Sequence, residues 1–357
     1  MAVLNPYIWN MAFEAYLDAR KNKRNTVDAH RFEANANLYL ADLVRDIDNR
    51  TYAPSRGIAF IVSRPVVREI FAAPFRDRVV HHMIYNTVAP WWDRHFIDDN
   101  YSCRVGKGTL YGINRMRHHI ASVSENYTKE TYILKLDLSG YFMSLPRARL
   151  FDTVMWGLDR QFHRDSVDYG LVRFLVRQII YDDPTRGVRL KGGVRDWDKL
   201  PKNKSLFNAR KGCGIVIGNL TSQLFSNVYL NQLDRFVTME LGHKHYGRYV
   251  DDFYVVSNSR VELIELIQVI EEYLDGIELV LHPKKRIIRD VRQGIDFLGV
   301  TIYPHRTIPN VRMKKGLYDA AYYEDAERVQ TYLGLMSHYN HKKWGMEAGV
   351  TSSALRG

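Results

Sequence analysis

The spacing of apolar and polar residues along the chain predicts a mixture of helices and strands. Apolar residues recur at helical spacing in "AFEAYLDAR", "LYLADLVRDI", "RDRVVHHMIYNTVAPWWDRHF", "NLTSQLFSNVYLNQLDRFVTMEL" and "RVELIELIQVIEEYLD". Runs rich in β-branched and aromatic residues predict strands in "GIAFIVSRPVVREIFAAPF", "YILKLDL", "YGRYVDDFYVVS", "IELVLHPKKRIIRD" and "GIDFLGVTIYP". Further helices are expected up to about Tyr181 and in "GLYDAAYYEDAERVQTYLGLMSHYNHKKW", which can form a small C-terminal subdomain.

Two stretches show neither the helical spacing nor the strand pattern. "DDNYSCRVGKGTLYG" is rich in turn-forming residues. The Gly-, Lys- and Arg-rich stretch "DDPTRGVRLKGGVRDWDKLPKNKSLFNARKG", at about 182–212, predicts a long basic loop or an irregular hairpin. Loops of this length inside a compact protein are usually functional or disordered.

Composition narrows the class of protein. With 357 residues, 46% hydrophobic and 25% charged, the chain is long enough for two or three packed subdomains. The net charge of +11 favours a polyanionic partner. Only Cys103 and Cys213 occur, without closely spaced Cys or His, so neither a disulfide scaffold nor structural zinc is expected. A reducing cytoplasm fits, and no apolar run of about 18 residues predicts a membrane span.

Adjacent aspartates, Asp251 and Asp252, interrupt the apolar run "GRYVDDFYVV". Consecutive side chains of a strand point to opposite faces, so the strand cannot hide or expose both carboxylates together. Burying an unpaired carboxylate is costly, so either a tight turn that exposes both groups or bound cations must compensate. The short flanking strands place the pair at a hairpin tip. On its own, such a pair is usually a solvated turn.

Asp137 ends another apolar strand, in "YILKLDLSGYFMSL". Alone it is compatible with a helix cap or a turn. Together with Asp251 and Asp252 it supplies enough carboxylates to hold two Mg²⁺ ions about 3.5–4 Å apart, which is the arrangement used in nucleotidyl transfer. Carboxylate oxygens with few nearby His or Cys favour Mg²⁺ over zinc, with Mn²⁺ as a possible substitute.

The stretches "LKLDLSGYF", "YVDD", "LHPKK" and "FLG" follow one another in this order. They resemble the two catalytic palm motifs, the lysine-bearing motif and the primer-grip turn of reverse transcriptases. "REIFAAPFRDRVVHHMI" and "YSCRVGKGT" resemble the fingers of that family, and "YLGLMSHYNHKKW" resembles the thumb of bacterial retroelement enzymes. The resemblance implies an α+β right-hand polymerase: fingers with N-terminal helices at 1–125, a palm at 126–303 that includes the basic insertion, and a short helical thumb at 304–357.

The stretch "GIVIGNLTSQ" differs from the common pattern of the family. Ile217 stands where most reverse transcriptases have glutamine, and Gln223 stands where they have proline. This pattern resembles the reverse transcriptases of diversity-generating retroelements, which copy a template-repeat RNA with frequent errors opposite adenines. Retron and group II intron-like enzymes fit the pattern less well, and a phage-defence reverse transcriptase or a catalytically silent RNA-binding scaffold remain alternatives.

The resemblance also implies partners and a location. The partners are template-repeat RNA, the RNA/cDNA duplex, dNTPs and a small basic multimeric accessory protein. No membrane is involved. The location is the cytoplasm of a bacterial or phage-infected cell.

Residue roles follow from the resemblance. Asp137, Asp251 and Asp252 are the expected catalytic metal ligands, with the carbonyl of Leu138 as a further oxygen ligand. Lys285 is the expected proton donor to the departing pyrophosphate, although the adjacent Lys284 is an equal candidate from sequence.

The incoming dNTP is expected to meet basic and bulky side chains. Arg68 matches the triphosphate-binding arginine of the family, and Arg64 is a substitute for a second basic residue, since Val66 occupies the usual position. Phe142 matches the bulky residue that excludes a ribose 2′-hydroxyl, against the simpler interpretation of core packing.

The nascent base pair is expected to lie against Ile217, Gly218, Asn219 and Gln223, where the alternative is a glycine turn followed by an amide helix cap. Phe297, Leu298 and Gly299 match the primer grip. Basic residues expected to contact nucleic-acid phosphates are Arg104, Lys107, Lys191, Arg195, Lys202, Lys204, Arg210 and Lys211.

Overall fold

The computed structural model describes residues 4–21, 26–63, 66–162, 168–339 and 341–350. Its helices are α1 (Pro6–Arg20), α2 (Val27–Ala34), α3 (Ala36–Asp48), α4 (Phe75–Asp93), α5 (Thr109–Val123), α6 (Tyr141–Ser144), α7 (Arg147–Phe162), α8 (Tyr169–Tyr181), α9 (Leu220–Arg235), α10 (Arg260–Gly276), α11 (Val311–Tyr322), α12 (Ala326–Leu335) and α13 (His341–Glu347). Its strands are β1 (Ile58–Val62), β2 (Arg68–Ala72), β3 (Tyr132–Asp137), β4 (Arg189–Leu190), β5 (Tyr246–Tyr249), β6 (Asp252–Ser257), β7 (Ile287–Asp290), β8 (Ile295–Phe297), β9 (Val300–Ile302) and β10 (Thr307–Pro309).

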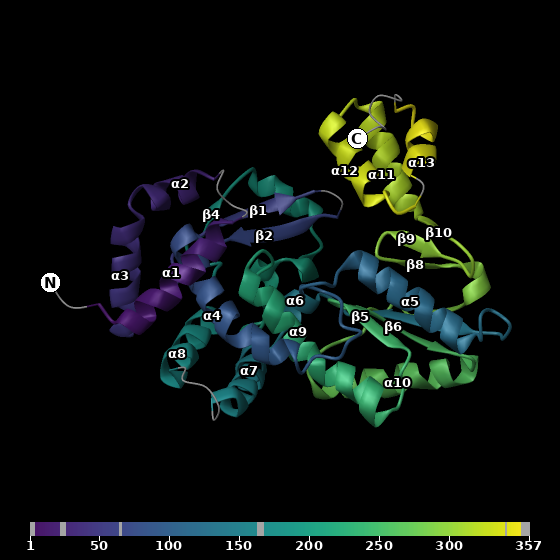
Figure 1. Cartoon of the computed structure of the whole chain (residues 1–357), viewed down its shortest axis with the longest axis horizontal. Helices are drawn as coiled ribbons and strands as arrows, with labels where there is room; N and C mark the ends of the chain where they lie inside the picture. The colour runs from purple at the N-terminus through teal and green to yellow at the C-terminus, as the bar shows by residue number, and fades with distance from the viewer. Residues whose placement is uncertain (1–3, 22–25, 64–65, 163–167, 340, 351–357) are drawn as a thin grey trace.

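A four-stranded antiparallel sheet, in the order β5-β6-β3-β7, forms the predicted palm. Along β6, Phe253 and Val255 point into the apolar cluster that includes α9 and α10, whereas Tyr254 and Val256 point into the cluster that includes α5. The sheet is therefore covered on both faces, as Figure 1 shows for α5 and α10. Burial of both faces explains why the strand is apolar almost throughout, rather than alternating.

The predicted strand pair in the fingers is confirmed: β1 and β2 are antiparallel, with Ala59 opposite Phe71. The basic insertion adds β4, which pairs in parallel with β1. The rest of the insertion forms the short 3₁₀ helices η1 (Val194–Lys199), η2 (Lys202–Lys204) and η3 (Leu206–Asn208). The insertion thus packs on the fingers sheet, although it lies within the palm in chain order.

Glu69 of β2 attaches the insertion to the fingers. Its carboxylate is fully buried and accepts hydrogen bonds from Trp197 Nε1 at 2.7 Å, Ser205 Oγ at 2.8 Å and the Leu206 N–H at 2.6 Å. A buried carboxylate is tolerated only when such donors replace the lost water. Glu69 therefore determines where the insertion docks.

The predicted N-terminal helices are confirmed as α1 and α3, and α1 packs along α4 in the largest apolar cluster. One strand prediction is only partly right. Residues 277–280 of "IELVLHPKKRIIRD" form no strand; Leu281 makes a single bridge to Leu138, and β7 begins at Ile287.

The C-terminal helices α11, α12 and α13 stand apart from the palm in Figure 1. They share a small apolar cluster of their own, built on Leu317, Ala320, Val329, Leu333 and Met336. The sheet β10-β9-β8 connects them to the palm. The helices predicted for this part of the chain are therefore confirmed.

Candidate active site

The hairpin predicted around the paired aspartates is confirmed. Strand β5 ends at Tyr249 and β6 begins at Asp252, so Val250 and Asp251 form the turn between them. Asp137, at the end of β3, lies directly opposite Asp252 in the antiparallel register. The Leu138 N–H donates to the Asp251 carbonyl at 3.3 Å. The fold therefore brings the three predicted acids together from stretches more than 100 residues apart.

Two lysines face these carboxylates. Lys285 Nζ lies 2.7 Å from Asp137 Oδ2, and Lys135 Nζ lies 3.0 Å from Asp252 Oδ2. Lys135 was not among the residues expected from sequence. Its signal was its position two residues before Asp137, because residues two apart on a strand share a face.

Burial and neighbouring charge disfavour the ionised form of two of the acids. Burial, together with the charges of Asp137 and Asp252, raises the pKa of Asp251 to about 6. Burial also raises the pKa of Asp252 to about 6, although Lys135 acts in the opposite direction. Clustered carboxylates in a low-dielectric setting are stabilised by a cation.

The donor set fits a hard divalent cation. All three side chains offer carboxylate oxygens, and Asp252 Oδ1 is buried without a hydrogen-bond partner in the described structure. Among the described residues, no group of three or more His, Cys, Asp or Glu side chains is arranged to hold a metal ion. Asp137 and Asp252 instead each pair with a lysine.

Lys285, rather than Lys284, contacts the acids as the chain is folded. Lys284 is exposed, and its backbone N–H donates to His282 Nδ1 at 3.2 Å. The two candidates that sequence left equal therefore differ in position, and Lys285 is the one beside Asp137.

On the fingers side, Arg68 begins β2 and is exposed, whereas Arg64 lies outside the described residues. Burial raises the pKa of Tyr249, and the positive charge of Arg68 partly offsets this rise. Arg68 is therefore close enough to act electrostatically on Tyr249, which precedes the turn that carries Asp251. The expected role of Arg64 as a second basic contact to the dNTP stays a prediction.

The stretch that resembles the retroelement pattern lies against the fingers strand β2. The Phe71 N–H donates to the Ile217 carbonyl at 3.0 Å. Gly218 has φ +125°, and a Cβ there would lie 2.9 Å from the Phe71 carbonyl oxygen, so glycine is required. Asn219 occupies the N-cap position of α9 without a side-chain cap hydrogen bond, which argues against the alternative of an amide cap.

Phe142 and Ile217 both pack at the edge of one apolar cluster, formed by Ala59, Phe71, Met143, Leu206 and Val216. Both side chains are half-buried, and Gln223 is exposed in the first turn of α9. The structure thus brings together Phe142 from α6, Ile217 and the fingers sheet.

The predicted primer grip is a tight hairpin turn between β8 and β9. Leu298 has φ +48° and Gly299 has φ +92°, as expected for a two-residue turn with both central residues left-handed. Phe297 is buried beneath it.

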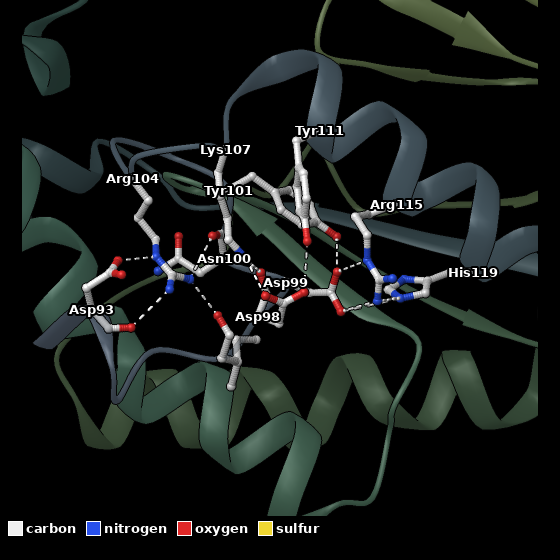
Figure 2. A network of polar contacts seen from close by, with 11 residues as sticks. Asp93, Asp98, Asp99, Asn100, Tyr101, Arg104, Lys107, Tyr111, Arg115 and His119 are labelled. Atoms are coloured by element: carbon white, nitrogen blue, oxygen red, sulfur yellow. Dashed lines mark hydrogen bonds and ion pairs between the residues drawn. The ribbon is translucent and has the colours of Figure 1, made fainter.

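Arg104 and Lys107, two of the expected phosphate contacts, pair with acids of the chain itself. Figure 2 shows both side chains directed at intramolecular acceptors. Arg104 Nε lies 2.6 Å from Asp93 Oδ1 and Lys107 Nζ lies 2.5 Å from Asp98 Oδ1, with side chains 8% and 12% exposed. The sequence shows that Arg104 and Lys107 are charged, but it does not show which acids they contact.

The basic insertion carries the rest of that set. Arg210 pairs with Glu278 at 2.6 Å. The other side chains are exposed, and within the described residues no ion pair involves them: Lys191, Arg195, Lys202, Lys204 and Lys211. The 3₁₀ helix η2 lies beside Gly140, three residues after the end of β3, because a Cβ on Gly140 would lie 2.6 Å from the Asn203 carbonyl oxygen.

The mixed helix and antiparallel-sheet architecture is that of right-hand polymerases. Residues 67–302 match the family described as "Reverse transcriptase (RNA-dependent DNA polymerase)". This match covers most of the chain, from the fingers strand β2 to β9, and the chain therefore belongs to the reverse transcriptase family.

Two relatives bear on the family and the fold. "Protein YkfC" of Escherichia coli strain K12 is 23% identical over 284 residues, which cover 69% of this chain and 66% of that protein. A telomerase from Candida albicans, solved with a TWJ fragment of telomeric RNA, matches in fold with a TM-score of 0.51 and 12% identity. That match covers 90% of this chain and 59% of the telomerase, so the chain spans about two thirds or less of both relatives.

Two further findings bear on the sequence predictions. Cys103 and Cys213 are free cysteines that form no disulfide. Among the residues described, no helix combines the length and the apolarity needed to cross a membrane.

Proposed function

We propose that the protein is an RNA-directed DNA polymerase that makes cDNA by two-metal nucleotidyl transfer. The observation that supports this most directly is the meeting of Asp137, Asp251 and Asp252 at the ends of β3 and β6, within a chain of the reverse transcriptase family. Carboxylates at the end of an antiparallel sheet can hold divalent cations without any His or Cys ligand.

Asp137, Asp251 and Asp252, with the carbonyl of Leu138, are the residues that would hold two Mg²⁺ ions. When bound, such ions activate the attacking hydroxyl and stabilise the leaving oxygen, and Mn²⁺ can take the same ligands. Lys285 would give a proton to the departing pyrophosphate, and the contact of its ammonium group with the carboxylate of Asp137 supports this role.

The space between the palm and the fingers is the proposed dNTP site. Arg68 would grip the triphosphate with its planar guanidinium. Phe142 would exclude a ribose 2′-hydroxyl by collision. Gly218 would allow close backbone approach to the nascent pair, and the Asn219 side chain, which makes no cap hydrogen bond at the start of α9, would offer its amide to template or dNTP.

We further propose that the enzyme serves a diversity-generating retroelement. Ile217 and Gln223 support this, together with the packing of Ile217 and Phe142 against the same apolar cluster. If Ile217 faces the templating base, it offers no hydrogen-bonding group, so one polar check on base-pair geometry is missing. The enzyme would then copy a template-repeat RNA with errors at adenines, with a small basic accessory protein, in a bacterial or phage-infected cell. A retron or defence system is the competing assignment.

Primer extension on an adenine-containing RNA template tests the polymerase assignment. We expect Mg²⁺-dependent cDNA from the wild type. Asp251→Ala should lower the rate by at least about 10³-fold, because one metal ligand is lost. Wild-type protein that binds RNA but makes no cDNA would instead identify an RNA-binding scaffold.

The retroelement assignment has its own experiment. We expect the wild type to misincorporate opposite template adenines, and Ile217→Gln to reduce this error by about 3- to 10-fold, the size of effect expected for one restored polar contact. Errors opposite the other three template bases serve as the internal control. Unchanged adenine-directed error in Ile217→Gln would remove Ile217 from the explanation.

A further inference from the structure

The turn that carries Asp251 has an unfavourable backbone conformation. Val250 precedes Asp251 and has φ +58°, in the left-handed region. A β-branched residue is rarely found there, because its side chain crowds the backbone. Such a conformation persists only where the surrounding structure enforces it.

Side chains hold both backbone polar groups of Val250. Its N–H donates to Ser102 Oγ at 3.1 Å, and its carbonyl accepts from Arg248 Nη1 at 2.9 Å. These bonds come from residues before and within the hairpin, so they fix the turn from two directions. Among the described residues, no side-chain hydrogen bond or ion pair joins Ser102 or Arg248 to the carboxylates of the proposed active site.

Ser102 and Arg248 are in turn held by two residues of α9. Asn227 accepts from Ser102 Oγ at 3.0 Å and donates through Nδ2 to the Ser102 carbonyl at 2.7 Å. Asp234 accepts from Arg248 Nε and Nη2, both at 2.6 Å. Asn227 Oδ1 also accepts from Arg248 Nη1 at 3.3 Å. We call Ser102, Asn227, Asp234 and Arg248 the turn clamp.

The turn clamp is buried, which makes its geometry specific. All four residues are at most 1% exposed. Although burial alone would lower the pKa of Arg248, the Asp234 carboxylate raises it, so the guanidinium stays charged. A buried bidentate ion pair tolerates little movement, because displacement of either partner leaves an uncompensated charge.

The segment that carries Ser102 has further contacts, some of them with the backbone of Arg248 itself. Figure 2 shows Asp99 held by Arg115 of α5, whose Nε and Nη2 donate at 2.7 and 2.9 Å. The backbone of this segment runs beside β5: the Arg248 N–H donates to the Asp99 carbonyl, and the Tyr101 N–H donates to the Arg248 carbonyl, both at 2.9 Å. Arg104 and Lys107, which were expected to contact phosphates, anchor the same segment through Asp93 and Asp98.

We propose that the turn clamp is a set of positioning residues that hold Val250 in its left-handed conformation, so that Asp251 is presented beside Asp137. This inference rests on the proposed function, since it assigns Asp251 a catalytic role. Three carboxylates in one place repel one another, and a strained turn without restraint would relax away from them. The clamp opposes that relaxation from beneath the hairpin.

Ser102→Ala is the sharpest test, because it removes the hydroxyl that accepts from the Val250 N–H and donates to Asn227, without leaving a buried charge. Ser124→Ala is its matched control. Ser124 is also fully buried, and its Oγ accepts the N–H of Tyr127 at 2.8 Å, a residue that likewise has a left-handed φ of +69°. The control therefore removes the same kind of bond at the end of α5, away from the proposed active site.

Two readouts are measured on both variants of the full chain. In primer extension with Mg²⁺, we expect Ser102→Ala to lower kcat by about 10- to 100-fold, as small misplacements of catalytic groups do, while KM for dNTP changes by less than about two-fold. In hydrogen–deuterium exchange, we expect residues 248–252 to exchange at least about 10-fold faster in Ser102→Ala. Ser124→Ala should alter neither quantity by more than about two-fold.

The outcomes separate the inference from the function on which it rests. If the wild type extends a primer and Ser102→Ala keeps its kcat, the positioning role is wrong, whatever the exchange rates. If the wild type does not extend, the proposed function fails, and exchange alone then decides whether the clamp holds the turn: equal rates for Ser102→Ala and Ser124→Ala overturn it. Lower kcat with faster exchange, in Ser102→Ala only, supports the inference.

Discussion

Among single residues, Asp137 and Asp252 have the environments that bear most directly on the proposed cation site. Each carboxylate faces one lysine ammonium, while Asp252 Oδ1 has no partner in the described structure. Half-buried acids in this arrangement can accept either an ammonium or a metal ion, and a doubly charged ion interacts more strongly than a lysine. The lysines therefore keep the acids together without binding them irreversibly.

Lys285 and Lys284 make a matched pair for a prediction at this scale. We expect Lys285→Ala to slow single-nucleotide incorporation by about 10²-fold, as loss of a general acid does, and Lys284→Ala to change it by less than about two-fold. The reason is position, since only Lys285 contacts Asp137 in the fold described here. Rapid-quench measurements at several pH values test this, and equal losses in both variants would contradict it.

Residues near one another in sequence were the predictable part of the site. Runs of β-branched and aromatic residues predicted the strands that carry Asp137 and Asp252 and the turn that holds Asp251, because strand preference is a local property. The ion pair of Arg248 with Asp234 was not predictable in the same way. A buried partner on another element leaves no periodic signal, and for the same reason Arg104 and Lys107 were expected to be free for phosphates.

At the scale of elements, the attachment of the basic insertion to the fingers is the feature that sequence did not indicate. Glu69 and Trp197 are 128 positions apart, and a glutamate in a strand predicts no particular partner. The insertion was expected to be a loop or an irregular hairpin. It instead adds β4 to the fingers sheet and places η2 beside Gly140, just after the end of β3.

We expect Glu69→Gln to loosen the insertion, because the amide group turns an acceptor of Trp197, Ser205 or Leu206 into a donor. The free energy of unfolding should fall by about 1–3 kcal/mol, the usual cost of an unsatisfied buried group. Limited proteolysis should cut residues 182–212 faster than in the wild type. Glu265→Gln, at an exposed position of α10, is the control and should behave as wild type. A Glu69→Gln variant with wild-type stability and cleavage would show that Glu69 does not anchor the insertion.

Across the whole molecule, the net charge of +11 is divided between cations with internal partners and cations that face solvent. Arg104, Lys107 and Arg248 belong to the first group. Lys202 and Lys204 belong to the second group, and they lie in η2, which is beside Gly140 just after the end of β3. Net charge alone therefore overstates the number of groups that can contact RNA phosphates.

This division predicts how RNA binding depends on salt. Each phosphate contact to a single strand contributes about 0.7 to the slope of log affinity against log salt concentration, because binding releases counterions. We expect the double variant Lys202→Ala, Lys204→Ala to bind RNA more weakly and to reduce that slope by about 1.4. The charge-matched control is Lys21→Ala, Lys129→Ala, which removes exposed lysines that pair with Asp18 and Glu125. Fluorescence anisotropy at several salt concentrations measures both slopes. If the two double variants change the slope equally, η2 does not contact RNA, and the charge of the insertion acts only as part of the overall field.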